Sequence, residues 1–228
     1  MATLGLIGSG QIGGTLARVA VDAGLDVVLS NSRGPQSLAG LVAELGPRAR
    51  AGTAQEAAYA GDWVVVSVPV KAYPLMPREA LVGKTVLDTG NYYVQRDGHI
   101  AELDSGETTH SGWLQRHLEG ASVVKVFNNI YFKHLGALPR PAGAGGDRAA
   151  LPIAGDDAGA KARATELLDV LGFDVVDAGP LAEGWRYQPD TPAYGSPYAD
   201  QSVADFTAQP PVPASVDDIK AALAAARR

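Results

Sequence analysis

A glycine-rich turn close to the N-terminus constrains the fold of this chain more than any other feature. The run Gly8-Ser9-Gly10-Gln11-Ile12-Gly13 follows an apolar segment, residues 3–7, and precedes residues 14–23, where apolar side chains recur at helical spacing. Strand, GxGxxG turn and helix in that order predict a dinucleotide-binding unit. Gly8 permits the turn, Gly10 lets the backbone approach a pyrophosphate, and Gly13 lets the helix pack closely on the strand. The free N–H groups and the dipole of the helix then bind the phosphates.

The end of the second predicted strand indicates which dinucleotide binds. Residues 25–30 form that strand, and Asn31-Ser32-Arg33-Gly34 follows it. An enzyme specific for NAD usually has Asp or Glu about 20 residues past the glycines, where it binds the ribose 2′-hydroxyl. This chain has no carboxylate there, and the planar guanidinium of Arg33 can bind a 2′-phosphate, with Ser32 and Asn31 beside it. We therefore predict NADP(H) as the cofactor.

Composition and charge exclude several other classes of protein. The formal net charge is −6 and no basic run of useful length occurs, which argues against nucleic acid as a partner. The chain has no cysteine, so disulfides, thiol catalysis and thiolate metal sites are excluded. His110 and His117 have no third ligand nearby, so we expect no metal. The N-terminus does not resemble a secretory signal and no apolar run is long enough to span a membrane, so we expect a cytoplasmic protein.

Strand and helix patterns alternate along most of the chain. Apolar, β-branched runs predict further strands within residues 62–69, 84–88, 122–127, 151–155 and 173–177. Helical spacing or helix-capping residues predict helices between them, among others at residues 36–45, 53–60 and 111–118, and at 72–81 with interruptions at Pro74 and Pro77. Residues 92–108 have no periodicity and predict an irregular insertion. The predicted fold is α/β: a Rossmann-type, doubly wound, mainly parallel sheet with helices on both faces.

The composition changes beyond residue 183. Residues 184–228 interleave tryptophan and tyrosine with many prolines and end in a helix that Ser215 and Asp218 can cap. We therefore divide the chain into an NADP-binding Rossmann-like domain, residues 1–183, and a small irregular C-terminal extension, residues 184–228. The extension is too small to fold alone, so we expect it to pack on the body or to cross to a second subunit in a homodimer.

Several polar residues follow strands at the carboxyl edge of the predicted sheet, where ligands of open α/β folds bind. Pro69 is expected to shape the loop beside the nicotinamide ribose, and Asn128 and Asn129 suit the nicotinamide carboxamide or an acceptor carbonyl, although they can equally cap the next turn. Asp88 is a loop cap as readily as a ligand. The candidates for a proton donor are Lys71, Tyr131 and His134; Lys71 can equally extend into solvent, and His134 can be purely structural.

Several landmarks coincide with those of a known family. They are the turn from Gly8 to Gly13, Asn31-Ser32-Arg33-Gly34-Pro35, Val68-Pro69, the segment from Val124 to Asn129, Ala154-Gly155-Asp156-Asp157 and Gly179-Pro180-Leu181. Together they resemble NADP oxidoreductases of the coenzyme F-420 (deazaflavin)-dependent type, and the related cytosolic domain of the ferric-reductase STEAP proteins, over residues 2 to about 183. The resemblance implies a Rossmann domain, usually dimeric, that passes hydride between NADPH and a deazaflavin stacked on the nicotinamide.

The resemblance also implies roles for individual positions. Ser9, Gln11 and Ile12 match the pyrophosphate turn, and Asn31, Ser32 and Arg33 match the 2′-phosphate loop. Val68 and Pro69 match the ribose side, and Asn128 and Asn129 lie near the carbon that transfers hydride. The extension from about residue 184 departs from the family pattern, which leaves the acceptor open.

Three functions are compatible with these patterns. The first is an NADP(H)-dependent oxidoreductase whose small-molecule acceptor is deazaflavin or a similar planar ring, because direct hydride transfer needs little acid–base chemistry. The second is an NADPH-dependent reductase of a small carbonyl or imine, which requires a proton donor. The third is a non-enzymatic NADPH-binding sensor.

Overall fold

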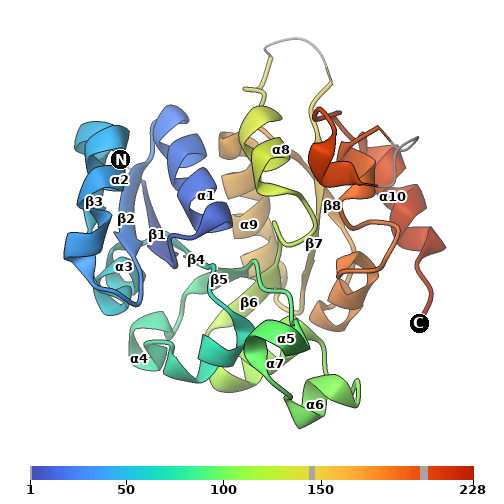
Figure 1. The fold of residues 1–228 in the computed structure, drawn as a ribbon, viewed down its shortest axis with the longest axis horizontal. Helices are drawn as coiled ribbons and strands as arrows, with labels where there is room; N and C mark the ends of the chain where they lie inside the picture. The colour runs from blue at the N-terminus through green and yellow to red at the C-terminus, as the bar shows by residue number, and fades with distance from the viewer. Residues whose placement is uncertain (1, 144–146, 201–204) are drawn as a thin grey trace.

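The computed structural model describes residues 2–143, 147–200 and 205–228. Within them one eight-stranded sheet crosses the molecule in the order β3-β2-β1-β4-β5-β6-β7-β8 (Figure 1). Neighbouring strands are parallel except β6 and β7. The predicted Rossmann-type, mainly parallel sheet is confirmed. The strands are β1 (Thr3–Ile7), β2 (Asp26–Ser30), β3 (Ala49–Ala51), β4 (Trp63–Val66), β5 (Thr85–Asp88), β6 (Ser122–Lys125), β7 (Ala150–Gly155) and β8 (Asp174–Asp177).

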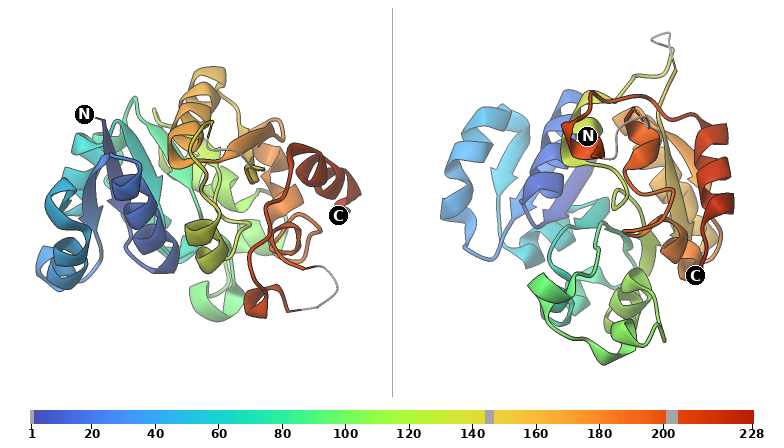
Figure 2. Two further views of the ribbon diagram at one scale, coloured as in Figure 1. Left: turned by 90° about the horizontal axis from the view of Figure 1, so that it is seen from above. Right: turned by 45° about the vertical axis from the view of Figure 1, so that its right-hand side comes forward.

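Helices cover both faces of this sheet, as the views in Figure 2 show. Side chains alternate along each strand, so Leu4 and Leu6 of β1 enter one core cluster while Ile7 enters the other. The first cluster is completed by α1 (Gln11–Asp22), α2 (Ala39–Leu45), α8 (Phe132–Ala137) and α9 (Ala158–Leu171), and the second by α3 (Ala54–Ala60), α4 (Arg78–Leu81) and α7 (His110–His117). No helix of the described residues is long and apolar enough to cross a membrane.

One predicted helix is shorter than expected, and another is interrupted at its prolines as the sequence indicates. The segment predicted at residues 36–45 begins with a 3-10 turn at Pro35–Leu38 before α2. The segment predicted at residues 72–81 is a 3-10 turn, Val70–Leu75, followed by α4. Pro74 and Pro77 lack the N–H that a continuous helix needs. The insertion at residues 92–108 contains α5 (Val94–Asp97) and α6 (Ala101–Asp104), which are too short to give a periodic pattern.

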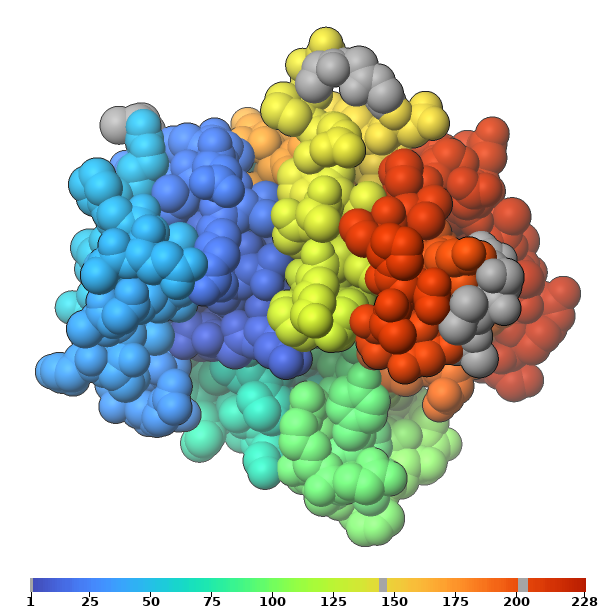
Figure 3. Space-filling view, turned by 45° about the horizontal axis from the view of Figure 1, so that its top comes forward, coloured from blue at the N-terminus to red at the C-terminus, as the bar shows by residue number. Residues whose placement is uncertain are grey.

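The C-terminal extension is built into the body of its own chain. Tyr187 and Tyr198 are fully buried, and their hydroxyls donate to the carbonyls of Lys125 and Ala150, each at 3.0 Å. Helix α10 (Val216–Ala225) has the predicted capping box at Ser215 and packs on β7 and β8. In Figure 3, α8 (yellow) lies between α1 (blue) and the extension (orange to red). The extension therefore reaches the carboxyl edge of the sheet. The homodimer stays a prediction, which light scattering tests.

Candidate cofactor and acceptor site

The turn between β1 and α1 has the geometry that a pyrophosphate site requires. Gly8 has φ +107°, and a Cβ there would lie 2.1 Å from the carbonyl oxygen of Ser67. A Cβ on Gly13 would lie 2.0 Å from the oxygen of Gly8, whereas one on Gly10 would meet no atom within 4 Å. No side chain caps the helix at Gly10, so the first N–H groups of α1 face open space. The turn therefore fits a dinucleotide phosphate.

A cavity of about 420 Å³ extends from this turn to the loop after β2. The Oδ1 atom of Asn31 accepts hydrogen bonds from the backbone N–H of Arg33 at 2.9 Å and from the Ser37 hydroxyl at 3.2 Å, which shapes the loop. The side chains of Ser32 and Arg33 are exposed beside it. The cavity places the predicted 2′-phosphate residues next to the phosphate turn. Its lining is Gly8, Ser9, Gly10, Asn31, Ser32, Arg33, Ser67, Val68, Pro69, Lys71 and Ala72.

A second cavity of about 390 Å³ lies at the carboxyl ends of β4 and β5. It shares Gly10, Ser67, Val68 and Pro69 with the first cavity, so the two form one continuous cleft. We call it the inner cavity. Its remaining lining is largely aromatic and amide: Gln11, Ile12, Thr89, Gly90, Asn91, Tyr93, Arg96, Asn128, Ile130, Tyr131, Phe132, Tyr194, Phe206 and Thr207.

Two buried asparagines in the inner cavity bind each other. The Nδ2 of Asn91 donates to the carbonyl oxygen of Asn128 at 2.8 Å, and the Nδ2 of Asn128 donates to Oδ1 of Asn91 at 3.1 Å and to the carbonyl of Tyr187 at 2.8 Å. These two acceptors fix the orientation of the Asn128 amide. Its Oδ1 is buried and has no hydrogen-bond partner among the described residues. Because such an atom is costly to leave unpaired, it fits the N–H groups of a nicotinamide carboxamide.

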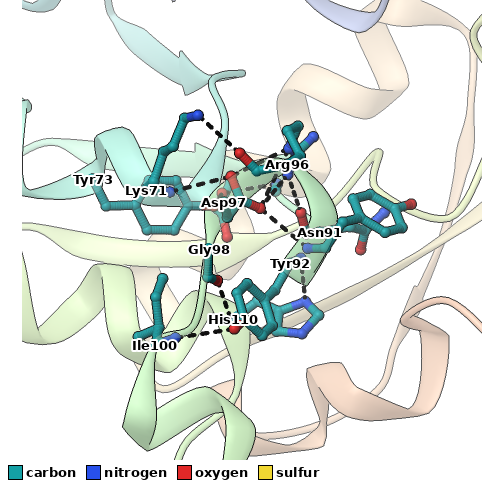
Figure 4. A network of polar contacts seen from close by, with 12 residues as sticks. Lys71, Tyr73, Asn91, Tyr92, Arg96, Asp97, Gly98, Ile100 and His110 are labelled. Carbon is teal, nitrogen blue, oxygen red and sulfur yellow. Dashed lines mark hydrogen bonds and ion pairs between the residues drawn. The ribbon is translucent and has the colours of Figure 1, made fainter.

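A charged pair holds the loop that carries Asn91 (Figure 4). The side chain of Asp97 is fully buried and receives hydrogen bonds from Arg96, the closest at 2.8 Å, and from the backbone of Tyr93 at 3.1 Å. Burial opposes ionisation of Asp97, but these hydrogen bonds outweigh it and lower its pKa. Arg96 also donates to the carbonyl of Asn91, and the Nζ of Lys71 donates to the carbonyl of Arg96 at 2.8 Å. The network fixes the floor of the inner cavity.

A buried lysine and carboxylate lie beneath this floor. Asp88 accepts hydrogen bonds from the hydroxyls of Tyr73 and Ser111, both at 2.6 Å, and from the N–H of Gly90 at 2.9 Å. The Nζ of Lys125 donates to the carbonyl of Gly90 at 2.9 Å and to the hydroxyl of Ser111 at 3.3 Å. Burial lowers the pKa of Lys125 to about 8, although Asp88 opposes the shift. Lys125 therefore positions the backbone that lines the cavity.

The structure brings together most of the site residues proposed from sequence, but not all. Gly8, Ser9, Gly10, Asn31, Ser32, Arg33 and Lys71 line the first cavity; Gln11, Ile12, Val68, Pro69, Asn128 and Tyr131 line the inner cavity. Gly13 is buried under the turn.

Asn129 and His134 face the extension instead of the cleft. The Nδ2 of Asn129 donates to the carbonyl of Ala193 at 2.9 Å and to the Tyr198 hydroxyl at 3.1 Å. His134 is 1% exposed, and its Nε2 bonds the carbonyl of Gln209 at 2.9 Å, so Nε2 is the donor. Both side chains therefore hold the extension in place, and His134 is not among the residues that line the inner cavity.

The sequence reasoning missed Tyr93, Arg96 and Phe206 as site residues; it expected the aromatic segment from Trp185 to Tyr198 to wall the acceptor site but did not single out Tyr194. All four residues lie in segments without periodicity, and they meet only in the folded chain. Tyr93 lies two residues after Asn91 in the loop that leaves β5, which is the one local signal that pointed to it. Burial lowers the pKa of His110 to about 3, and its Nδ1 accepts a hydrogen bond from the N–H of Tyr92 at 3.2 Å. Among the described residues no group of three or more metal-ligating side chains occurs.

Comparison with known proteins agrees with this geometry. Residues 3–92 match the sequence model of the family described as "NADP oxidoreductase coenzyme F420-dependent". This segment contains the phosphate turn and the loop at Arg33, so the resemblance to the deazaflavin-dependent family is confirmed. The likeness to the ferric-reductase domain stays a prediction. No curated protein matches the chain.

Solved structures with the same fold include reductases. A hypothetical protein from Sinorhizobium meliloti is 29% identical with a TM-score of 0.72, covering 85% of this chain and 93% of its own. A protein from Arthrobacter sp., provisionally described as an F420-dependent NADP-reductase, is 24% identical with a TM-score of 0.64, covering 79% of this chain and 85% of its own. An imine reductase from Pseudomonas sp. is 18% identical with a TM-score of 0.52, covering 78% of this chain and 56% of its own. The last two likenesses bear on the fold alone.

Proposed function

We propose that this NADP-dependent oxidoreductase, whose residues 3–92 carry the coenzyme F420-dependent family domain, transfers hydride between NADPH and a deazaflavin or a similar planar acceptor. The observation that carries the proposal is the continuous cleft, which leads from Arg33 past the phosphate turn into the aromatic inner cavity. One end suits a phosphorylated dinucleotide and the other suits a flat ring. A Rossmann fold binds its dinucleotide at this edge of the sheet.

Each part of the cleft has a distinct task. The N–H groups at the start of α1 bind the pyrophosphate, Arg33 binds the 2′-phosphate, and Oδ1 of Asn128 orients the carboxamide. The bound nicotinamide supplies the hydride. Tyr131 and Phe206 present aromatic surface to the acceptor and exclude water from the inner cavity. Holding two flat rings in register lowers the entropic part of the barrier, which is why little acid–base chemistry is required.

Cofactor choice gives the first prediction. Replacing Arg33 with alanine removes a charge-assisted bond to the 2′-phosphate, so NADPH affinity falls by roughly 10- to 150-fold, or about 1.5–3 kcal/mol, while NADH affinity hardly changes. Isothermal calorimetry on wild type and variant measures both. Arg116→Ala is the control, because Arg116 is exposed and pairs with Glu107 away from the cleft. Equal affinity of the wild-type protein for NADPH and NADH would contradict the assignment of the loop.

Acceptor choice is tested by the rate of NADPH oxidation with deazaflavin, free flavin and a panel of small carbonyl compounds. The proposal expects turnover with planar rings and little with the carbonyl panel. Tight NADPH binding without oxidation by any of them supports the non-enzymatic sensor instead.

Reduction of a small carbonyl or imine is the second candidate, because tyrosine hydroxyls from Tyr93, Tyr131 and Tyr194 line the inner cavity and can supply a proton. Under this alternative the carbonyl panel is reduced in preference to flat rings. His134→Ala is expected to leave most of the rate under either reading, since His134 does not line the inner cavity.

A further inference from the structure

We infer that the paired hydroxyls of Tyr93 and Tyr194 bind an oxygen atom of the acceptor, so that the preferred substrates are planar rings with an oxo group on the edge. The inference rests on the proposed function and names a contact for its acceptor. Tyr93 follows β5, whereas Tyr194 lies in the C-terminal extension, and their Oη atoms are 3.0 Å apart. The two hydroxyls therefore join the opposite walls of the inner cavity.

The pair lies at the boundary between two cavities. Tyr93, Tyr194 and Phe206 line the inner cavity and also a neighbouring one of about 580 Å³, which we call the outer cavity. The outer cavity is otherwise mostly polar, with Gln95, Asp190, Thr191 and Ser196 on its walls. A ring in the inner cavity would thus have its edge at the tyrosine hydroxyls, and a polar substituent of that ring could extend past them.

The hydroxyl pair is suited to donate a hydrogen bond. Two hydroxyls carry two hydrogens, and their mutual bond uses only one of them. Neither hydroxyl has another hydrogen-bond partner among the described residues, so the second hydrogen is available to a ligand. Burial of Tyr194, together with its bond to Tyr93, raises its pKa, so that it remains a protonated donor at physiological pH. The bond within the pair also polarises the outer O–H.

Neighbouring groups hold both rings in place. The Tyr194 ring meets Phe206 edge to face, with centroids 5.8 Å apart, and the guanidinium of Arg96 lies 5.0 Å from the centroid of Tyr93. A Cβ at Gly195 would come within 2.6 Å of the Phe206 ring, so the present position of Phe206 against Tyr194 depends on a glycine at residue 195. A donor that is fixed before the reaction stabilises developing charge without reorganisation.

The role in the reaction follows from the electron balance. The acceptor ring gains a hydride, NADPH is oxidised to NADP⁺, and the added electron pair is delocalised onto the conjugated oxo group. That oxygen accepts the hydrogen bond, or the proton, of the tyrosine pair, and water returns any proton to the tyrosine. A planar acceptor without an oxo group gains nothing from this contact, which makes the inference specific.

The test compares Tyr93→Phe, Tyr194→Phe and the double variant with wild type. Each is assayed with NADPH and two oxo-bearing rings, deazaflavin and menadione, and with phenazine methosulfate, a planar acceptor without an oxo group. Tyr59→Phe is the matched control, because Tyr59 is 59% exposed on α3. We expect the double variant to lose about 10²–10³-fold in kcat with the oxo-bearing rings, and either single variant about 10-fold. The solvent deuterium isotope effect should change in the double variant, and NADPH affinity should not.

The outcomes separate this inference from the proposed function. If the double variant binds NADPH and reduces deazaflavin and menadione at the wild-type rate, the inference is overturned and the proposed function stands. If it loses all three acceptors equally, the pair only shapes the cavity, which also overturns the inference. If wild type binds NADPH but reduces no planar acceptor, the proposed function fails and the inference with it. Thermal melting checks that the variants are folded. Should the double variant unfold, the single variants are compared instead: a loss in kcat confined to the oxo-bearing rings supports the inference, and its absence overturns it.

Discussion

Replacing Lys125 with methionine lowers the free energy of unfolding by about 1–3 kcal/mol at pH 7, because buried acceptors lose their donor. Methionine keeps most of the apolar volume but removes the buried ammonium group. The carbonyl of Gly90 then loses a donor at 2.9 Å, and the buried carboxylate of Asp88 loses the nearby cation. A buried carbonyl that loses its donor costs more than an exposed ion pair contributes. Urea denaturation with both proteins measures the difference.

The control is Lys220→Met, because the Lys220 side chain is 62% exposed and its removal should change stability by less than about 0.5 kcal/mol. A change below about 1 kcal/mol for Lys125→Met would show that the network does not depend on its cation.

The same lysine makes stability depend on pH in a defined direction. Burial lowers the pKa of Lys125 from 10.5 to about 8, against the opposing effect of Asp88. Between these two values the unfolded chain binds more protons at this position than the folded chain, so this lysine's contribution to stability rises with pH. Below the folded pKa both states are protonated and the burial penalty is present in full. The stability of wild type minus that of Lys125→Met should therefore be larger at pH 10 than at pH 7.

Replacing Gly13 with alanine destabilises the fold by about 3 kcal/mol or more, whereas Gly10→Ala mainly weakens cofactor binding. A Cβ introduced at Gly13 would lie 2.0 Å from the backbone oxygen of Gly8, and backbone cannot turn aside as a flexible side chain can. At Gly10 the new methyl group meets no atom within 4 Å, so stability should change by no more than about 1 kcal/mol. The methyl group would instead occupy the space through which a pyrophosphate approaches the turn.

Thermal or chemical denaturation in the absence of cofactor, with NADPH calorimetry beside it, measures both effects. For Gly10→Ala we expect NADPH affinity to fall at least about 10-fold, equivalent to about 1.4 kcal/mol. Equal loss of stability in the two variants would contradict the different roles of these glycines.

The sequence was informative where structure is set by neighbouring residues. The strand, turn and helix around Gly8 lie within one short segment, and the capping boxes at Thr53 and Ser215 each need only residues three apart. For that reason the phosphate turn, the strands of the sheet and several helix starts were predictable. The three-residue strand β3 was not, because so short a run carries no periodicity.

The segments that wall the acceptor half of the cleft were predictable from their composition, but the pairs of side chains that meet there were not. Tyr93 and Tyr194 are 101 residues apart and meet only because the extension folds back along the sheet edge. The sequence made His134 a candidate proton donor, but its Nε2 bonds the carbonyl of Gln209, which lies 75 residues later in the chain. A pattern along the chain cannot report contacts at such separations.

The position of the extension has a consequence for the order in which the protein is made. Residues 3–92, which supply the phosphate turn and the loop at Arg33, leave the ribosome before the extension does and contain five neighbouring parallel strands. Tyr187 and Tyr198, which complete the interior beside β6 and β7, emerge much later. The nascent chain therefore carries the residues that line its dinucleotide pocket before those that complete its acceptor pocket.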